Sequence, residues 1–398
     1  MFKEYSPMQY LAIDIANQYG NGLDKETYET RIAWVKHKAD RLEEFQDKAE
    51  ETFLFKKAVN AFRQAQAGIP TGHVVGLDCA SSGLQLMSAM MGCEKGMALT
   101  GLIHPNIRAD SYTLITQAMN EKVEVHVTRA QAKSAVMKGL YGSLAAPKEV
   151  FGDLVDTFYE TMHEQAPGAM QLLELLRQAW NPEVDRNTWS LPDGYLAMVP
   201  ITETVDKKIH VAQLRYTPVV RIQVVAPKET GLSLIANCTH SVDAYVLRTL
   251  VRRCNYVPRE VNRMYAILKA TVKTTDYESE YVRIYRETNM VDMTMIHATE
   301  TEVAGFPMAM RLKLLRMLNI CKQHKPFEII TIHDDFKCSP VNANQMRRVY
   351  ADIIGDIVDS TLVDNLLNQL YQDDKVIEKH GNVKELAKIA RESNYGIS

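Results

Sequence analysis

The sequence contains no closely spaced pair of cysteines. Its six cysteines are scattered singly over 398 residues, and no two of them form a C-x-x-C motif. Zinc clusters and disulfide frameworks depend on such spacing, so neither kind of site is expected. Unpaired cysteines are typical of a reducing compartment, which favours a cytoplasmic protein.

Long apolar runs are also absent. No stretch of roughly eighteen residues is both uncharged and apolar, which is the length that a membrane-spanning helix requires. The first twenty residues lack the basic region and apolar core of a secretory signal peptide. We therefore expect neither secretion nor contact with a membrane.

An excess of positive charge is the third missing feature. Lysine and arginine total 46 against 49 acidic residues, giving a formal net charge of −3. This balance argues against a protein that coats nucleic acid non-specifically. It does not exclude a nucleic-acid enzyme, because such an enzyme needs positive potential only along its cleft.

The apolar pattern predicts an α+β protein rich in helices. Residues 8–67 are predicted to be helical up to Gly68-Ile69-Pro70, followed by a short strand, GHVVGLD, that ends at Asp78. Further helices are predicted over 106–142, 150–181, 242–254, 259–273 and 309–323, and from 343 onward. Residues 189–200 are predicted to be β structure, and 219–236 to form a hairpin about the turn KETG. FEIITIHDDFKCSP is predicted to give a buried strand, a turn and an exit strand.

Two aspartates stand at the ends of predicted strands. Asp78 and Asp334 each follow an apolar run at the point where a turn begins. Strands placed side by side would bring both carboxylates together, where they could hold a pair of Mg²⁺ ions for displacement at a phosphate. Taken singly, either residue is better explained as a turn or cap residue.

Two cations and an aromatic share one face of a predicted helix. Arg129 and Lys133 are four residues apart, and Tyr141 is eight further on. Such a row can grip a triphosphate and stack on a base or sugar. The alternative is a solvated basic helix whose tyrosine belongs to the core.

Three motifs occur in the order found in one polymerase family. The segment from Asp78 to Gln85, DCASSGLQ, resembles motif A of the single-subunit RNA polymerases of phages and mitochondria. Arg129 to Ser143 resembles motif B, and IHDDF at 332–336 resembles motif C. WSLPDG at 189–194 and THSVD at 239–243 are similar to further family segments.

The resemblance implies a role for each matching residue. Asp78, Asp334 and the backbone carbonyl of Cys79 would bind two Mg²⁺ ions. Arg129, Lys133, Tyr141, Tyr112 and Gly83 would contact the nucleotide, and Lys133, Tyr141 and His333 would take part in catalysis. His240, Gln85 and His333 would contact nucleic acid, although His240 could equally be a buried structural histidine.

The substrate is predicted to be a ribonucleotide. Related DNA polymerases usually carry a glutamate five residues after the first aspartate, which crowds the 2′ position of the sugar, whereas this chain has Gly83. Tyr141 replaces a phenylalanine common in those enzymes and offers a hydroxyl that can sense the 2′-OH.

Some family features are missing or displaced. Residues 1–77 contain no T/D-x-x-G-R motif, which holds the template hybrid in the family. We therefore expect the template-holding and promoter-opening part to come from a second protein subunit, as in the split RNA polymerase that enquatroviruses carry. Leu86 replaces a family histidine, and residues 256–315 are an insertion. The predicted hairpin at 219–236 occupies the place of the promoter-reading loop, and a plain surface hairpin is the alternative.

The combined prediction is a phage-type, DNA-dependent RNA polymerase acting in the cytoplasm of an infected bacterial host. Its partners would be a DNA template, the RNA product, ribonucleoside triphosphates, the second subunit and, if promoter opening requires it, an accessory factor. The expected domains are a palm with an antiparallel sheet at 1–105 and 316–398, fingers at 106–255, and the insertion at 256–315. The rival hypotheses are a DNA polymerase or primase-like relative and an inactive polymerase fold that only binds nucleic acid.

Overall fold

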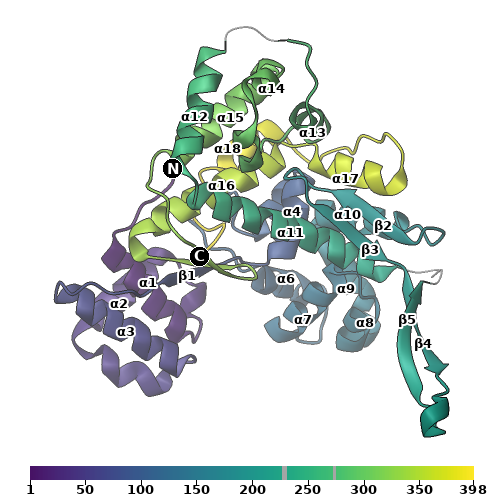
Figure 1. Cartoon of the computed structure of the whole chain (residues 1–398). Coiled ribbons are helices and arrows are strands. Elements are labelled where there is room, and N and C mark those ends of the chain that lie inside the picture. The colour runs from purple at the N-terminus through teal and green to yellow at the C-terminus, as the bar shows by residue number, and fades with distance from the viewer. Residues whose placement is uncertain (226–230, 272–274) are drawn as a thin grey trace.

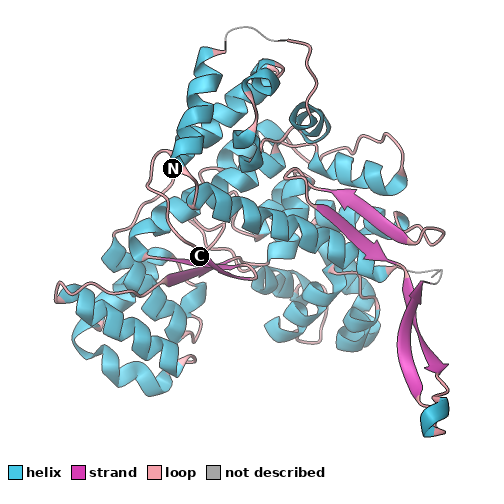
Figure 2. Ribbon diagram, in the orientation of Figure 1, coloured by secondary structure: helices cyan, strands magenta, loops and turns pink. Residues whose placement is uncertain are grey.

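The computed structural model describes residues 1–225, 231–271 and 275–398 (Figure 1). Helices dominate, and the strands in this part of the chain form small antiparallel sheets (Figure 2). This agrees with the predicted helix-rich α+β class. Within the same residues no helix combines the length and apolar character needed to cross a membrane.

The N-terminal residues form a helical lobe around a small aromatic core. Its helices are α1 (Pro7–Tyr19), α2 (Tyr28–His37) and α3 (Thr52–Gln66). A capping box begins α1, because Ser6 accepts from the backbone of Gln9 while the Gln9 side chain accepts from the backbone of Ser6. The rings that join the three helices are those of Tyr19, Trp34, Phe45 and Phe55.

A three-stranded sheet joins segments that lie far apart in the sequence. Its strands are β1 (Val75–Asp78), β6 (Ile330–Ile332) and β7 (Asp335–Cys338), in the order β1-β7-β6. The register pairs Asp78 with Asp335. The prediction of a buried strand before the second aspartate is wrong, since Ile330 and Ile332 remain 53% and 52% exposed. The physical reason is that both isoleucines lie on a face of β6 that the hydrophobic core does not cover.

Helices cover the sheet on the core side. The helix after β1 is α4 (Ser82–Met90), and the helix after β7 is α16 (Ala343–Val358), which packs on α4. The long helix α11 (Leu232–Cys254) packs against both. These three helices form the centre of the main hydrophobic core.

The next part of the chain is helical, in line with the prediction for 106–142 and 150–181. The helices are α5 (Glu94–Leu99), α6 (Ser111–Asn120), α7 (Arg129–Leu140), α8 (Ala145–Phe151), α9 (Val155–Gln165) and α10 (Pro167–Gln178). A capping box of Thr128 and Gln131 begins α7. It ends before Gly142, whose φ of +96° requires a glycine.

Two hairpins follow, and one of them differs from the prediction. The first pairs β2 (Arg186–Ser190) with β3 (Leu196–Pro200). The second pairs β4 (Thr202–Lys208) with β5 (Val219–Val225) and projects from the body (Figure 1).

The predicted hairpin over 219–236 is therefore wrong. The partner of β5 precedes it in the chain, and α11 begins at Leu232. Most of the predicted KETG turn, residues 228–230, lies outside the described residues. The run after it is helical because Leu234, Ile235, Cys238 and Val242 recur at helical spacing and are all buried.

Residues beyond α11 form a helical unit with a hydrophobic cluster of its own. Its helices are α12 (Pro258–Ala270), α13 (Glu280–Thr288), α14 (Glu300–Ala304) and α15 (Met308–Cys321). The buried residues of this cluster lie between Val261 and Cys321, so most of them come from the segment predicted as an insertion.

Buried ion pairs attach this unit to the main body. Arg316 of α15 and Arg253 of α11 both bind Asp352 and Asp356 on α16. The chain then continues into α17 (Leu362–Tyr371) and α18 (Val383–Ala390). Short 3-10 helices complete the description: η1 (Leu23–Lys25), η2 (Ala39–Lys48), η3 (Gly152–Leu154), η4 (Ala212–Leu214), η5 (Met293–His297) and η6 (Pro340–Asn342).

Candidate active site

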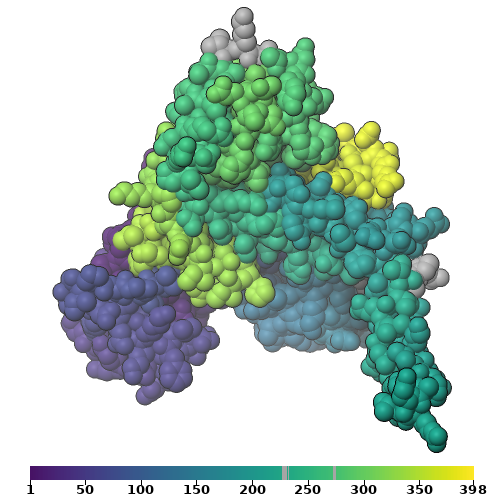
Figure 3. Space-filling model, viewed as in Figure 1, coloured from purple at the N-terminus to yellow at the C-terminus, as the bar shows by residue number. Residues whose placement is uncertain are grey.

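The central sheet brings the two predicted acids to one place. Asp78 is the last residue of β1, and Asp334 lies in the tight turn between β6 and β7. His333, in the same turn, has a φ of +56°. Because Asp78 pairs with Asp335, the turn lies beside the end of β1. Both acids line a cavity of about 230 Å³. Figure 3 shows that the surface is hollowed between the N-terminal lobe and the helices from α6 onward, and the cavity opens in this region.

The acids repel each other. Burial in the wall of the cavity, and then the charges of Asp334 and Asp335, raise the pKa of Asp78 to about 6. The backbone N–H of Cys79 donates to Asp78 Oδ1 at 2.9 Å and partly offsets this effect. A buried carboxylate whose ionised form is disfavoured by its acidic neighbours creates a site at which a cation is strongly favoured.

The oxygen donors present fit a magnesium ion. Within the described residues no group of three or more His, Cys, Asp or Glu side chains is arranged to hold a metal. Mg²⁺ does not need such a cage, since it commonly binds through one or two carboxylates and keeps waters and substrate phosphates as its other ligands. Cys79 lines the same cavity, and the role of its carbonyl stays a prediction.

Helix α7 forms the opposite wall of this cavity. Arg129, Lys133 and Met137 line it at helical spacing. Arg129 is held in place by Asp110, with Nε donating at 2.8 Å and Nη2 donating at 3.1 Å. The predicted basic face is therefore turned toward the acids, and not away from the cleft.

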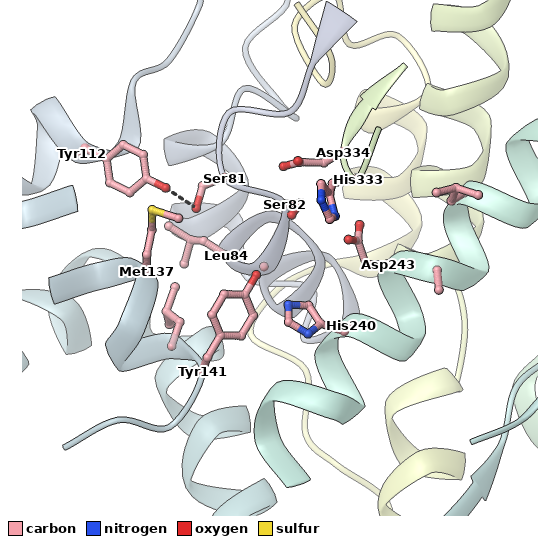
Figure 4. Close-up of a pocket in the computed structure, with 14 residues that line it drawn as sticks. Ser81, Ser82, Leu84, Tyr112, Met137, Tyr141, His240, Asp243, His333 and Asp334 are labelled. Carbon is pink, nitrogen blue, oxygen red and sulfur yellow. Dashed lines mark hydrogen bonds between the residues drawn. The ribbon is translucent and has the colours of Figure 1, made fainter. Parts of the chain in front are cut away.

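Tyr112 supports both cations. The Arg129 guanidinium carbon lies 5.5 Å and Lys133 Nζ lies 5.9 Å from the centre of its ring. These are distances at which a cation is attracted to a ring face. Tyr112 also donates from its hydroxyl to Ser81 Oγ at 3.3 Å (Figure 4). Tyr112, which the sequence predicted to contact the nucleotide, is thus only 8% exposed, and it lines both this cavity and a second one described below.

A second, more apolar cavity of about 550 Å³ adjoins the first (Figure 4). Its walls include Gly83, Tyr141, His240 and His333, and it shares Asp334 with the first cavity. The rings of Tyr141 and His240 are 4.6 Å apart. Burial raises the pKa of Tyr141 to about 12, so its hydroxyl stays protonated near neutral pH and can donate a hydrogen bond.

The comparison with protein families finds a match in the N-terminal part of the chain. Residues 4–145 match the model of the DNA-dependent RNA polymerase family. The match covers less than half of the chain. It contains Asp78, Gly83 and the whole of α7, whereas Asp334 and His240 lie beyond the match. A search of curated proteins found no match.

One predicted site residue within the matched segment is placed differently by the structure. Gln85 was expected to contact nucleic acid, but its side chain is fully buried. Its amide nitrogen donates to the carbonyls of Thr100 and Gly396, and its oxygen accepts from Tyr350 at 2.5 Å. All of these groups are internal, so Gln85 is a structural residue and the prediction is wrong.

Asp243 is a pocket residue that the predicted site did not include. It lies on α11 one turn after His240 and lines the larger cavity. Burial and the charge of Asp334 raise its pKa to about 6. The sequence did hold a signal for it, since Asp243 is the last residue of the THSVD segment.

Three further charged residues around Asp78 were also missed. Lys25 comes from η1, while Arg108 and Asp110 come from the loop before α6. Irregular segments have no periodicity that would show which way a side chain points. No sequence pattern could therefore have selected these residues.

Proposed function

We propose that the chain is the catalytic subunit of a phage-type, DNA-dependent RNA polymerase. One observation carries this proposal: Asp78, Asp334 and the cationic face of α7 line one cavity, and two of these three elements lie within the segment that matches the polymerase family. An acid pair facing a row of cations suits the transfer of a nucleotidyl group from a triphosphate.

The reaction is the extension of RNA by one nucleotide. The oxygen of the RNA 3′-hydroxyl attacks the α-phosphorus of a ribonucleoside triphosphate, and the bond from that phosphorus to the bridging oxygen of the β-phosphate breaks. Pyrophosphate leaves, and the hydroxyl proton passes to water. When bound, two Mg²⁺ ions would supply activation of the hydroxyl and neutralisation of the triphosphate.

The chain's own residues bind and orient the reactants. Asp78 and Asp334 hold the ions, and Lys133 and Arg129 bind the triphosphate from the α7 side. His333, beside Asp334, steadies the RNA end. Tyr141 and Gly83 border the larger cavity, which takes the sugar and base, and Gly83 in the place of a glutamate keeps the cavity beside the Tyr141 hydroxyl open to the 2′-hydroxyl.

The larger architecture follows the same proposal. The part that contains the three-stranded sheet acts as the palm, and the helices from α6 to α11 act as the fingers. The projecting β4–β5 hairpin takes the promoter-contacting role first assigned to 219–236. The template-holding T/D-x-x-G-R motif does not occur within residues 1–398, and the proposed enzyme includes a second polypeptide that supplies this function.

Primer extension tests the function and its rivals together. The purified chain, with and without a co-expressed partner subunit, is given an RNA primer on a DNA template with ribonucleotides or deoxyribonucleotides. We expect Mg²⁺-dependent extension with ribonucleotides. Preferential use of deoxyribonucleotides would favour a DNA polymerase, and binding of the scaffold without extension by either would indicate an inactive polymerase fold.

A further inference from the structure

Arg108 lies between two cavities on either side of Asp78. It lines the cavity that contains both acids and α7. It also lines a third cavity, of about 190 Å³, whose walls include Asp78, Lys25, Asp335 and Lys337. The guanidinium therefore borders the cavity of the acid pair from the loop before α6, whereas Arg129 and Lys133 border it from α7.

The guanidinium of Arg108 is available to a ligand, unlike the side chains of Arg129, Lys337 and Lys25. Its Nε donates to Ser398 Oγ at 3.2 Å, and it makes no ion pair with any described residue. Arg129, by contrast, already holds Asp110 through two hydrogen bonds. Lys337 is paired with Asp335 at 3.0 Å, and Lys25 is paired with Asp24.

The position of Arg108 is fixed relative to Asp78. Its hydrogen-bond partner Ser398 donates from its backbone N–H to the carbonyl of Asp78 at 2.9 Å. The preceding residue, Ile397, forms a β-bridge with Cys79. Arg108 is therefore tied to the end of β1 and would keep its place when a ligand enters the cleft.

The charges around Arg108 also favour the binding of an anion. Burial lowers the pKa of Arg108, while the charges of Asp110, Asp24 and then Asp78 oppose that effect. Asp110 is committed to Arg129 and Asp24 to Lys25, and a cation bound at Asp78 would cancel the charge of that carboxylate. In that state a half-buried guanidinium lacks a counter-ion, and a phosphate can supply one through two parallel hydrogen bonds.

We propose that Arg108 is a phosphate-binding residue that holds the terminal phosphates of the nucleotide, and then the pyrophosphate product, opposite Lys133. This inference rests on the proposed polymerase function. It assigns the two sides of the phosphate chain to different parts of the protein, with α7 on one side and the loop before α6 on the other.

Direct binding of inorganic pyrophosphate tests this proposal without requiring catalysis. Calorimetry with Mg²⁺ and pyrophosphate compares the full chain with Arg108→Gln and Arg108→Lys. The control is Lys138→Gln, which removes an exposed charge from the last turn of α7, away from the cavities. We expect Arg108→Gln to weaken binding roughly tenfold or more, Arg108→Lys to recover part of the loss, and the control to match the wild type.

The outcomes separate this inference from the function on which it rests. Pyrophosphate binding that is equally tight in wild type, Arg108→Gln and Arg108→Lys overturns the role of Arg108, even if the enzyme extends RNA. Binding that depends on Arg108 in a chain that extends neither RNA nor DNA supports the site and contradicts the polymerase function. If Arg108→Gln does not fold, Arg108→Lys decides, because loss of the two-pronged geometry alone must weaken binding.

Discussion

Gly83 lies directly against the phenol ring of Tyr141. A Cβ atom built on Gly83 would lie 3.0 Å from the hydroxyl oxygen of Tyr141 and 3.3 Å from its Cζ, so the ring would have to shift to admit a side chain. Gly83 lies in α4, and the limit on residue 83 is therefore the space beside Tyr141 and not the backbone conformation. The contact connects the segment after Asp78 with the end of α7 and sets the width of the larger cavity.

The contact predicts an energetic coupling between residues 83 and 141. Gly83→Ala gains about 0.5–1 kcal/mol from helix propensity, and the contact of the methyl group with the phenol ring opposes this gain by about 1–3 kcal/mol. In a Tyr141→Phe background the oxygen at 3.0 Å is gone, and the cost should fall by about 1 kcal/mol. Urea unfolding of the four proteins measures the coupling, and additive effects would mean that the two residues do not touch.

Tyr141→Phe should also reduce the discrimination between ribose and deoxyribose. The hydroxyl is the part of Tyr141 that can bond a 2′-OH, and one neutral hydrogen bond corresponds to a factor of about two to ten. We expect the ratio of kcat/KM for ribonucleotides over deoxyribonucleotides to fall by that factor, with ribonucleotide KM rising most. An unchanged ratio would assign the discrimination to other residues.

The raised pKa of Asp78 predicts a pH-dependent cost to the fold. The folded pKa of about 6 is above the ordinary value of 3.8, so ionised Asp78 destabilises the metal-free protein above pH 6. This cost fades between pH 6 and pH 4, where the folded carboxyl is increasingly protonated. In EDTA, Asp78→Asn should therefore be more stable than wild type at pH 8 and equal to it near pH 4.

The affinity for Mg²⁺ should also depend on the ionisation of Asp78, but it should increase with pH, whereas the stability of the metal-free protein decreases. The carboxylates must be ionised to bind Mg²⁺, so affinity should rise as the pH passes through about 6 and level off above it. Calorimetric titration with Mg²⁺ at pH 5, 6, 7 and 8 measures this. An affinity that does not change over that range would separate Asp78 from the metal site.

Gln85 is expected to support the fold and not the substrate. Gln85→Met keeps most of the side-chain volume but leaves the carbonyls of Thr100 and Gly396 and the hydroxyl of Tyr350 without their partner. We expect a loss of about 3 kcal/mol in the free energy of unfolding. Under conditions where Gln85→Met is folded, its affinity for the RNA–DNA scaffold should equal that of the exposed control Gln117→Met. If Gln85→Met is stable but binds the scaffold more weakly, Gln85 does contact nucleic acid.

The sequence predicted the strands that carry the acids because each is a short apolar run that ends at a turn. It could not predict how these strands pair, since β1 and β7 are more than 250 residues apart and nothing local sets their register. The error at 219–236 has a physical cause. A short apolar run such as LSLIA fits a strand or a helix equally well, and only its continuation into α11 decides between them.

The candidate site likewise contains residues that the sequence could predict and residues that it could not. Arg129, Lys133 and Tyr141 were predictable because helical spacing places them on one face, and the structure turns that face toward the acids. The fate of Gln85 was not predictable, because its partners come from three distant segments. Arg108 was missed for a related reason, since its relation to Asp78 depends on a bridge made by the last residues of the chain.

The central claim is that Asp78 and Asp334 together hold the ions that drive nucleotidyl transfer. Primer extension on an RNA–DNA scaffold, with Mg²⁺, ribonucleotides and the partner subunit, should compare wild type with Asp78→Asn, Asp334→Asn and the exposed control Asp374→Asn. We predict that each of the first two substitutions lowers the extension rate by at least about 10³-fold, which corresponds to about 4 kcal/mol, with the scaffold still bound, and that the control retains full activity. Extension at the wild-type rate by either Asp78→Asn or Asp334→Asn would contradict the account.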